Sequence, residues 1–168
     1  MTINISPLHL LIFTFIRDIF PIWRECNNRG ITPWIELTEN EKYPEGIDKK
    51  RMISQFGVCR GLGSKIAIDD YGSGYNVGEA LLSVVKPNVL KIDRSLMRNR
   101  SQHSAFWERL RFLSRKYQIE LLSEGIESYE DLRFAKAQGI AYFQGYYLGK
   151  PGSLNQLSKK HTAYCSSP

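Results

Sequence analysis

The sequence predicts an α/β fold built on a parallel sheet. Six short apolar runs recur along its 168 residues, and longer segments with the apolar spacing of helices separate them. A helix between two strands carries the chain back to the starting edge, so the strands lie parallel. Such a sheet is either doubly wound or part of a barrel. The six runs are residues 2–6, 34–38, 65–69, 88–93, 119–123 and 140–144.

The segments between these runs carry the signals of helices. In residues 101–117, apolar side chains recur every three or four positions, which places them on one face of a helix. Residues 128–131 read as a capping box, which predicts the start of another helix. The apolar positions of the first of these two helices are Phe106, Leu110, Leu113 and Tyr117.

The apolar stretch of residues 10–16 is too short to cross a membrane. Arg17 and Asp18 end it after seven residues, whereas a spanning helix needs about 20. No basic segment precedes it, and no cleavage site of small residues follows it. We therefore expect no membrane span but a buried helix, which Pro21 kinks or divides in two.

Composition indicates one cytoplasmic domain that does not bind nucleic acid. The formal net charge of +6 weakly favours anionic partners such as phosphates. The basic residues form no stripe with interleaved aromatic side chains, so we expect no nucleic-acid partner. Cys26, Cys59 and Cys165 are far apart and lack metal-site spacing, which indicates a reducing compartment, the cytoplasm.

Polar side chains lie in or at the ends of the predicted strands. The carboxyl ends of parallel strands share one edge, where barrels build their active sites. One acidic residue at a strand end is usually a turn former or a helix cap, but a whole set favours a shared site. Carboxylate and amide oxygens suit Mg²⁺, Mn²⁺ or Ca²⁺ rather than zinc. The set comprises Asn4, Glu36, Asp69, Asp70, Lys91, Asp93, Glu124 and Gln144.

Asp69 and Asp70 are adjacent, and such close like charges repel unless a cation neutralises them. A pair of metal ions that shares one aspartate and uses the other accounts for this arrangement. Two such ions activate water and stabilise the leaving oxygen in phosphate-ester hydrolysis. In that reaction Lys91 holds the attacking water or a phosphate oxygen, and Glu124 acts as general base or as a ligand of the second ion.

Six motifs follow one another along residues 2–152. They are INISP (3–7), ELTE (36–39), DDYGSGY (69–75), LKIDRS (90–95), SEGIES (123–128) and FQGYYLGKP (143–151). Their order and spacing resemble those of the EAL domain, a bacterial phosphodiesterase that linearises cyclic di-GMP on a modified TIM barrel. The resemblance implies a partial EAL domain over residues 1–152, with about six parallel strands of an incomplete TIM-like (β/α) barrel. Residues 153–168 would form a C-terminal tail.

The resemblance also implies a role for each matching residue. Metal ligands, for Mg²⁺ or Mn²⁺, match Asn4, Glu36, Asp69 and Asp70. The lysine that serves the water and the glutamate that acts as base match Lys91 and Glu124. Positions that contact substrate match Asp93, Glu127 and Gln144. Glu39 matches a glutamate that anchors the loop of residues 71–76, which contributes to the response to cyclic di-GMP and to homodimerisation.

The Glu-Ala-Leu motif of the family is missing from its usual place. It normally lies on a strand well before INISP, which here begins at residue 3. Residues 79–81 read Glu-Ala-Leu, but they fall in the helix after the glycine loop, and we interpret them as an accident of sequence. The expected domain therefore lacks one metal-ligating glutamate and about two strands of the barrel.

Three functions remain open at this point. The first is a cyclic di-GMP phosphodiesterase that produces linear pGpG. The second is a catalytically degenerate remnant that binds cyclic di-GMP or a protein. The third, outside the family, is a doubly wound domain whose acidic pocket accepts phosphate as receiver domains do, although it accounts for neither ELTE nor the QGYY sequence.

Overall fold

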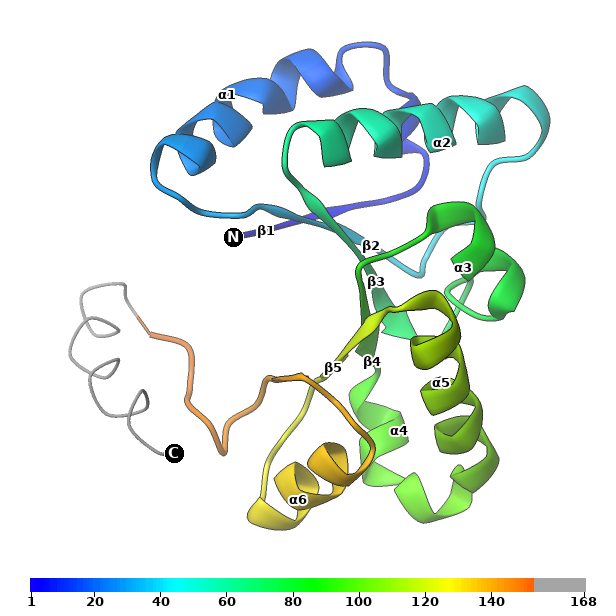
Figure 1. The fold of residues 1–168 in the computed structure, drawn as a ribbon, viewed down its shortest axis with the longest axis vertical. Helices are drawn as coiled ribbons and strands as arrows, with labels where there is room; N and C mark the ends of the chain where they lie inside the picture. The colour runs from blue at the N-terminus through cyan, green and yellow to red at the C-terminus, as the bar shows by residue number, and fades with distance from the viewer. Residues whose placement is uncertain (153–168) are drawn as a thin grey trace.

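The computed structural model describes residues 1–152, and the predicted tail of residues 153–168 lies outside them. Helices separate successive strands (Figure 1). The strands are β1 (Thr2–Ile5), β2 (Trp34–Leu37), β3 (Lys65–Tyr71), β4 (Val89–Ile92), β5 (Glu120–Ser123) and β6 (Tyr142–Phe143). The helices are η1 (His9–Leu11), α1 (Phe15–Asn28), α2 (Gly46–Gly61), α3 (Glu79–Val85), α4 (Arg94–Arg98), η2 (Arg100–Gln102), α5 (Ser104–Tyr117) and α6 (Tyr129–Ala137). All six predicted strands are confirmed.

The strands form one parallel sheet and follow their order along the chain, from β1 to β6. A doubly wound sheet reverses its strand order at a switch point, and the sheet of residues 1–152 has no such reversal. The α/β class is therefore confirmed, and the doubly wound alternative is wrong. Within the described residues, β1 and β6 each pair with a single strand, so the sheet is an open part of a TIM-like barrel.

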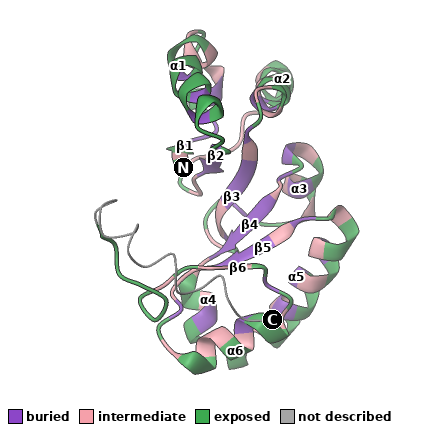
Figure 2. Cartoon of the chain, turned by 60° about the vertical axis from the view of Figure 1, so that its left-hand side comes forward, coloured by how far each residue is buried: buried purple, intermediate pink, exposed green. Residues whose placement is uncertain are grey.

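A hydrophobic core joins the outer face of the sheet to the helices. Alternate residues of a strand point to opposite faces, and the buried residues in Figure 2 follow β3 to β5 and the helix sides that face them. Phe56 of α2 and Leu90 of β4 belong to this core and are at most 1% exposed. Burying one such side chain stabilises the fold by about 1.5–3 kcal/mol. The outer face thus supplies stability and leaves the inner face for other chemistry.

The inner face of the sheet carries side chains in layers, as the interior wall of a barrel does. Near the amino ends of the strands, Lys65 pairs with Glu120 at 2.9 Å, and its ammonium lies over the rings of Trp34 and Tyr142. A small apolar layer follows, made of Ala67, Val89 and Leu122. Beyond it, toward the carboxyl ends, lie the acidic residues that the sequence singled out.

For the first helical segment, the expected buried helix over residues 10–16 is wrong, and of the two effects expected of Pro21, a kink or a division, the division is wrong. Residues 10–16 run from η1 through a bend into α1 and do not form one buried helix, since Phe13 is 95% exposed. Pro21 does not divide α1, which continues through it. The proline leaves unpaired the carbonyl of Arg17, four residues earlier, but Arg17 is exposed and water can replace that bond. Within residues 1–152, no helix combines the length and the apolar character that a membrane crossing requires.

Local side-chain contacts fix two other helices as expected. Ser128 accepts a hydrogen bond from the backbone of Asp131 at 3.1 Å, and Asp131 accepts one from the backbone of Ser128 at 3.0 Å, which is the predicted capping box of α6. Residues 79–81 lie in α3, where Glu79 pairs with Lys116 of α5 at 2.6 Å. This Glu-Ala-Leu triplet therefore joins two helices and is no strand motif.

Gly145→Ala is expected to destabilise the fold by about 1–3 kcal/mol, the usual cost of overpacking. Gly145 follows β6, and a Cβ there would overlap the backbone nitrogen and carbonyl oxygen of Ile126. Gly149→Ala is the matched control, because an added Cβ meets nothing within 4 Å. Urea denaturation measures both variants, and equal midpoints for the two would contradict this packing.

Candidate active site

The paired aspartates lie at a bulge in β3. Ile68 is opposite Leu90 of β4, but Tyr71 is opposite Ile92, so β3 has one extra residue between these pairs. Neighbouring residues of a regular strand point to opposite faces, whereas a bulge lets two successive side chains share one face. Asp70 adopts a left-handed φ of +43°, which aspartate tolerates better than most residues.

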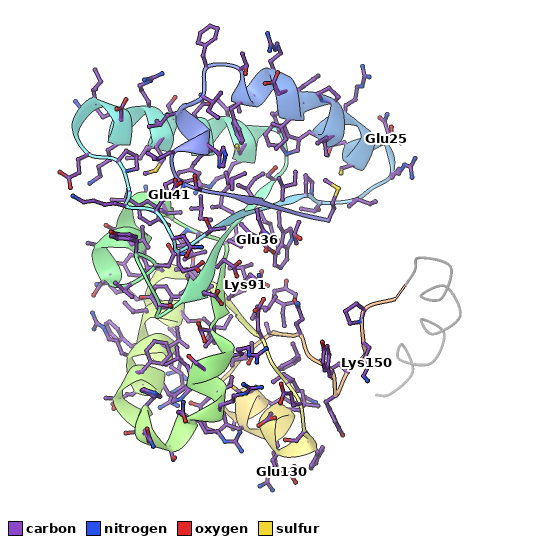
Figure 3. The ribbon with its side chains drawn as sticks, turned by 180° about the vertical axis from the view of Figure 1, so that it is seen from behind. Glu25, Glu36, Glu41, Lys91, Glu130 and Lys150 are labelled. Atoms are coloured by element: carbon purple, nitrogen blue, oxygen red, sulfur yellow. The ribbon has the colours of Figure 1, made fainter. Side chains whose placement is uncertain are left out.

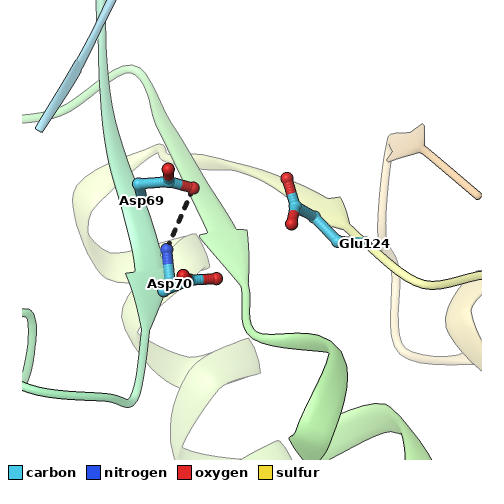
Figure 4. A group of neighbouring side chains, drawn as sticks. All are labelled: Asp69, Asp70 and Glu124. Carbon is cyan, nitrogen blue, oxygen red and sulfur yellow. Dashed lines mark hydrogen bonds between the residues drawn. The ribbon is translucent and has the colours of Figure 1, made fainter. Parts of the chain in front are cut away.

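Glu124 completes a cluster of three carboxylates. It follows β5, and Figure 4 shows its side chain turned toward Asp69 and Asp70. One oxygen from each of the three residues lies within 4.8 Å of the other two. Asp69 Oδ1 also accepts the backbone N–H of Asp70 at 3.1 Å. The structure thus brings together side chains that are about 55 positions apart in the sequence, as expected of parallel strand ends.

Lys91 of β4 supplies the counter-charge of this cluster (Figure 3). Its Nζ lies 2.7 Å from Asp69 Oδ1 and 2.9 Å from both Glu36 Oε2 and Glu124 Oε1. The Lys91 side chain is 8% exposed, so solvent screens these ion pairs only weakly. One buried ammonium therefore links β2, β3 and the end of β5.

Burial and charge shift two pKa values in this cluster. Burial alone would lower the pKa of Lys91, but hydrogen bonds to the three carboxylates outweigh it and hold that pKa above its ordinary value. The pKa of Asp70 is raised to about 6, first by burial and then by the charges of Asp69 and Asp93. Lys91 therefore stays protonated at neutral pH. Asp70 loses its proton at a higher pH than an ordinary aspartate, as the pH rises through about 6.

The donor atoms at this rim suit a hard divalent cation. The carboxylates of Asp69, Asp70 and Glu124 offer oxygen ligands only, which Mg²⁺, Mn²⁺ and Ca²⁺ prefer. Asn4 of β1 is the register partner of Glu36 of β2, so their side chains belong to the same face of the sheet. Asn4 is exposed on the edge strand, whereas Glu36 is buried.

The three residues expected near substrate have contacts of their own. Asp93 caps α4 by accepting a hydrogen bond from the backbone of Ser95 at 2.6 Å. Glu127 pairs with Arg98 of α4 at 2.9 Å, and both side chains are about half exposed. Gln144 is exposed directly after β6. All three lie on segments that follow strands, the side of the sheet where the carboxylates converge.

Glu39 contacts the loop of residues 71–76 through its main chain. Its carbonyl oxygen accepts a hydrogen bond from the backbone of Tyr75 at 3.0 Å. Gly74, at φ +50°, approaches so closely that an added Cβ would lie 3.1 Å from the Cβ of Glu39 and would overlap its carbonyl oxygen. This contact fixes the loop against the segment that follows β2.

Sequence reasoning missed Asn76, a fully buried residue next to the cluster. Its Nδ2 donates to the carbonyl of Leu37 at 2.9 Å and to that of Asp69 at 2.6 Å, and its Oδ1 accepts from the Tyr43 hydroxyl at 2.7 Å. The available signal was an asparagine directly after a glycine-rich turn, where such side chains often bond to nearby backbone.

Comparison with known proteins agrees with this geometry. The family model described as the EAL domain matches residues 1–151. The chain belongs to the EAL domain family. The probable cyclic di-GMP phosphodiesterase PdeG of Escherichia coli K12 is 28% identical over 160 residues, which are 94% of this chain and 31% of PdeG. This EAL domain chain thus spans about a third of that relative.

Solved EAL structures share the fold. The EAL enzyme Bd1971, in its cAMP-bound form, is 28% identical with a TM-score of 0.79, over 95% of this chain and 43% of Bd1971. YkuI of Bacillus subtilis, an EAL domain protein in complex with cyclic di-GMP and calcium, is 27% identical with a TM-score of 0.74, over 96% of this chain and 42% of YkuI.

Lys91→Met is expected to lower the free energy of unfolding by about 3–5 kcal/mol in EDTA, because buried carboxylates lose their counter-charge. Lys65→Met is the matched control from the neighbouring strand. Lys65 and Glu120 are 34% and 43% exposed, so this pair contributes about 0–1 kcal/mol. Urea denaturation at neutral pH compares the variants. Equal losses in the free energy of unfolding would contradict a larger contribution from the buried ion pairs of Lys91.

Asp70→Asn is expected to raise the melting temperature of the metal-free domain at pH 8 but not at pH 4. The folded-state pKa of Asp70 is about 6 against an ordinary 3.8, so the folded protein holds a proton that the unfolded chain releases. The stabilisation from this bound proton is fully present below the ordinary pKa of 3.8 and is lost as pH rises through the folded-state pKa of about 6. Thermal unfolding in EDTA at both pH values tests this, and a pH-independent difference would contradict it.

Proposed function

We propose that this EAL domain hydrolyses cyclic di-GMP to linear pGpG with Mg²⁺ or Mn²⁺. The observation that carries the proposal is the convergence of Asp69, Asp70 and Glu124 within 4.8 Å, with Lys91 beside them. Barrel enzymes build their active sites at this rim. The activity named for PdeG and the ligand bound to YkuI support the substrate class.

The proposed metal ligands are oxygen donors from three successive strands. When bound, the ions lower the pKa of water and stabilise the leaving oxygen of the phosphodiester. Asp69 and Asp70 contribute two carboxylates from one bulge, and Glu36 and Asn4 add donors from the two preceding strands. The proposed domain covers residues 1–152, with Asp93, Glu127 and Gln144 on the substrate side.

Glu124 and Lys91 carry the proton and charge chemistry of the proposed reaction. Glu124 accepts a proton as a water oxygen forms its bond to phosphorus, and the bond from phosphorus to the 3′ oxygen breaks. The proton that Glu124 took from the water, or an equivalent one from solvent, passes to that oxygen, so the products are a 5′-phosphate and a free 3′-hydroxyl. The ammonium of Lys91, 2.9 Å from Glu124 Oε1, orients this base. One of its three N–H groups, which bond to carboxylates here, would turn to a phosphoryl oxygen or to the water.

A second candidate is a module that binds cyclic di-GMP, or a protein, without turnover. It is favoured by the exposure of Asn4, the proposed metal ligand on β1. An exposed ligand holds a metal ion less firmly than one fixed by surrounding groups.

We also propose a cytoplasmic homodimer that contacts its second copy through the loop of residues 71–76. Tyr75 of this loop is 51% exposed and the adjacent Val77 is 50% exposed, which leaves apolar surface for a partner copy. The buried free thiols of Cys26 and Cys59 agree with a reducing compartment.

The test is chromatographic conversion of cyclic di-GMP to linear pGpG in Mn²⁺ buffer. We expect Mn²⁺-dependent turnover that EDTA abolishes and that Glu124→Gln lowers about 10²- to 10⁴-fold, the usual contribution of a general base. Glu120→Gln is the matched control at the other end of β5, the strand that Glu124 follows. Glu120 pairs with Lys65 there, and the variant should keep the full rate.

Two results would overturn hydrolysis at this site. Full turnover by Glu124→Gln would remove Glu124 from the reaction. Binding of cyclic di-GMP in a calorimetric titration, without any pGpG, would establish the second candidate in place of the enzyme.

A further inference from the structure

Asn76 closes the loop that follows the paired aspartates. Its backbone carbonyl accepts from Gly72 at 2.9 Å, and its backbone N–H donates to Ser73 at 3.0 Å. Its side chain, which is completely buried, turns back to the ends of β2 and β3. A buried amide with a partner for each bond is costly to replace, because its neighbours would lose theirs as well.

The side chain of Asn76 holds the peptide group that joins Asp69 to Asp70. Nδ2 donates to the carbonyl of Asp69 at 2.6 Å, while Asp69 Oδ1 accepts the N–H of Asp70 at 3.1 Å. The peptide plane is therefore fixed from both of its polar ends. Its orientation sets the left-handed φ of Asp70, and thus the direction in which both carboxylates point.

Tyr43 continues this connection away from the cluster. Its hydroxyl donates to Asn76 Oδ1 at 2.7 Å, which directs both amide hydrogens of Asn76 toward the carbonyls of Leu37 and Asp69. Burial raises the pKa of the Tyr43 phenol, so the hydroxyl stays a donor at neutral pH. The segment between β2 and α2 thereby reaches the bulge through one asparagine.

We propose that Asn76 is a positioning residue, which orients the carboxylates of Asp69 and Asp70 for a divalent cation through the peptide between them, with Tyr43 holding its amide in place. The proposal rests on the metal site of the proposed function. It adds residues that contact neither metal nor substrate and that act through the backbone.

The test is the Mn²⁺ affinity of folded variants, followed by the loss of the paramagnetic resonance signal of free Mn²⁺, together with urea denaturation in EDTA. We expect Asn76→Ser to weaken Mn²⁺ binding about 10- to 100-fold, as the loss of an outer-sphere partner does. Tyr43→Phe should weaken it less. Asn88→Ser is the matched control: Asn88 Oδ1 accepts from the Ile66 backbone at 2.8 Å, at the other end of β3. It should lower stability without changing the affinity.

Normal Mn²⁺ affinity in Asn76→Ser and Tyr43→Phe would overturn the proposal, even if both variants are less stable. Where Asn76→Ser does not fold, Tyr43→Phe decides: weaker binding supports the proposal and unchanged binding overturns it. A wild-type chain that binds no Mn²⁺ would instead remove the metal site itself, and with it the proposed function.

Discussion

The ammonium of Lys91 makes the acidic rim of this sheet possible. Glu36, Asp69 and Glu124 each place an oxygen within 2.9 Å of it, and Asp70 lies beside them. Removing uncompensated carboxylates from water costs several kcal/mol per ion, so without this cation the ends of β2, β3 and β5 would repel one another. The arrangement of the strand ends therefore exists before any ligand arrives, which lowers the cost of ordering them on binding.

The strands were predictable because each is a short apolar run between turn or helix signals, and both faces of a barrel strand are covered. The sequential strand order was not predictable from those runs, since apolar periodicity does not distinguish a barrel from a doubly wound sheet. The segment of residues 10–16 misled because apolar composition does not imply burial: Leu10 is fully buried and Phe13 is almost fully exposed. The division expected at Pro21 does not occur, because the cost of a proline inside a helix depends on the exposure of Arg17, four residues earlier.

Residue type and strand position predicted the members of the acidic rim, because parallel strands end at a common edge. Their pairing depends on contacts between distant residues and was not predictable. Lys91 was expected to hold the attacking water or a phosphate oxygen. In the structure it is also the counter-ion of the carboxylates. Asn76 escaped notice because two of the three partners of its side chain, Leu37 and Tyr43, are more than thirty positions away.

The bulge in β3 changes the parity of the strand. Up to Ile68 the even-numbered residues face the helices, and after the bulge an odd-numbered residue, Tyr71, lies in that core with 4% of its surface exposed. Deleting one residue at Asp69 or Asp70 would remove the bulge and restore regular alternation. Tyr71 would then stay on the core face, but β3 would present one carboxylate instead of two to the inner face. The extra residue of β3 thus adds a second carboxylate to the inner face without moving Tyr71 out of the core, so the length of this strand matters as much as its composition.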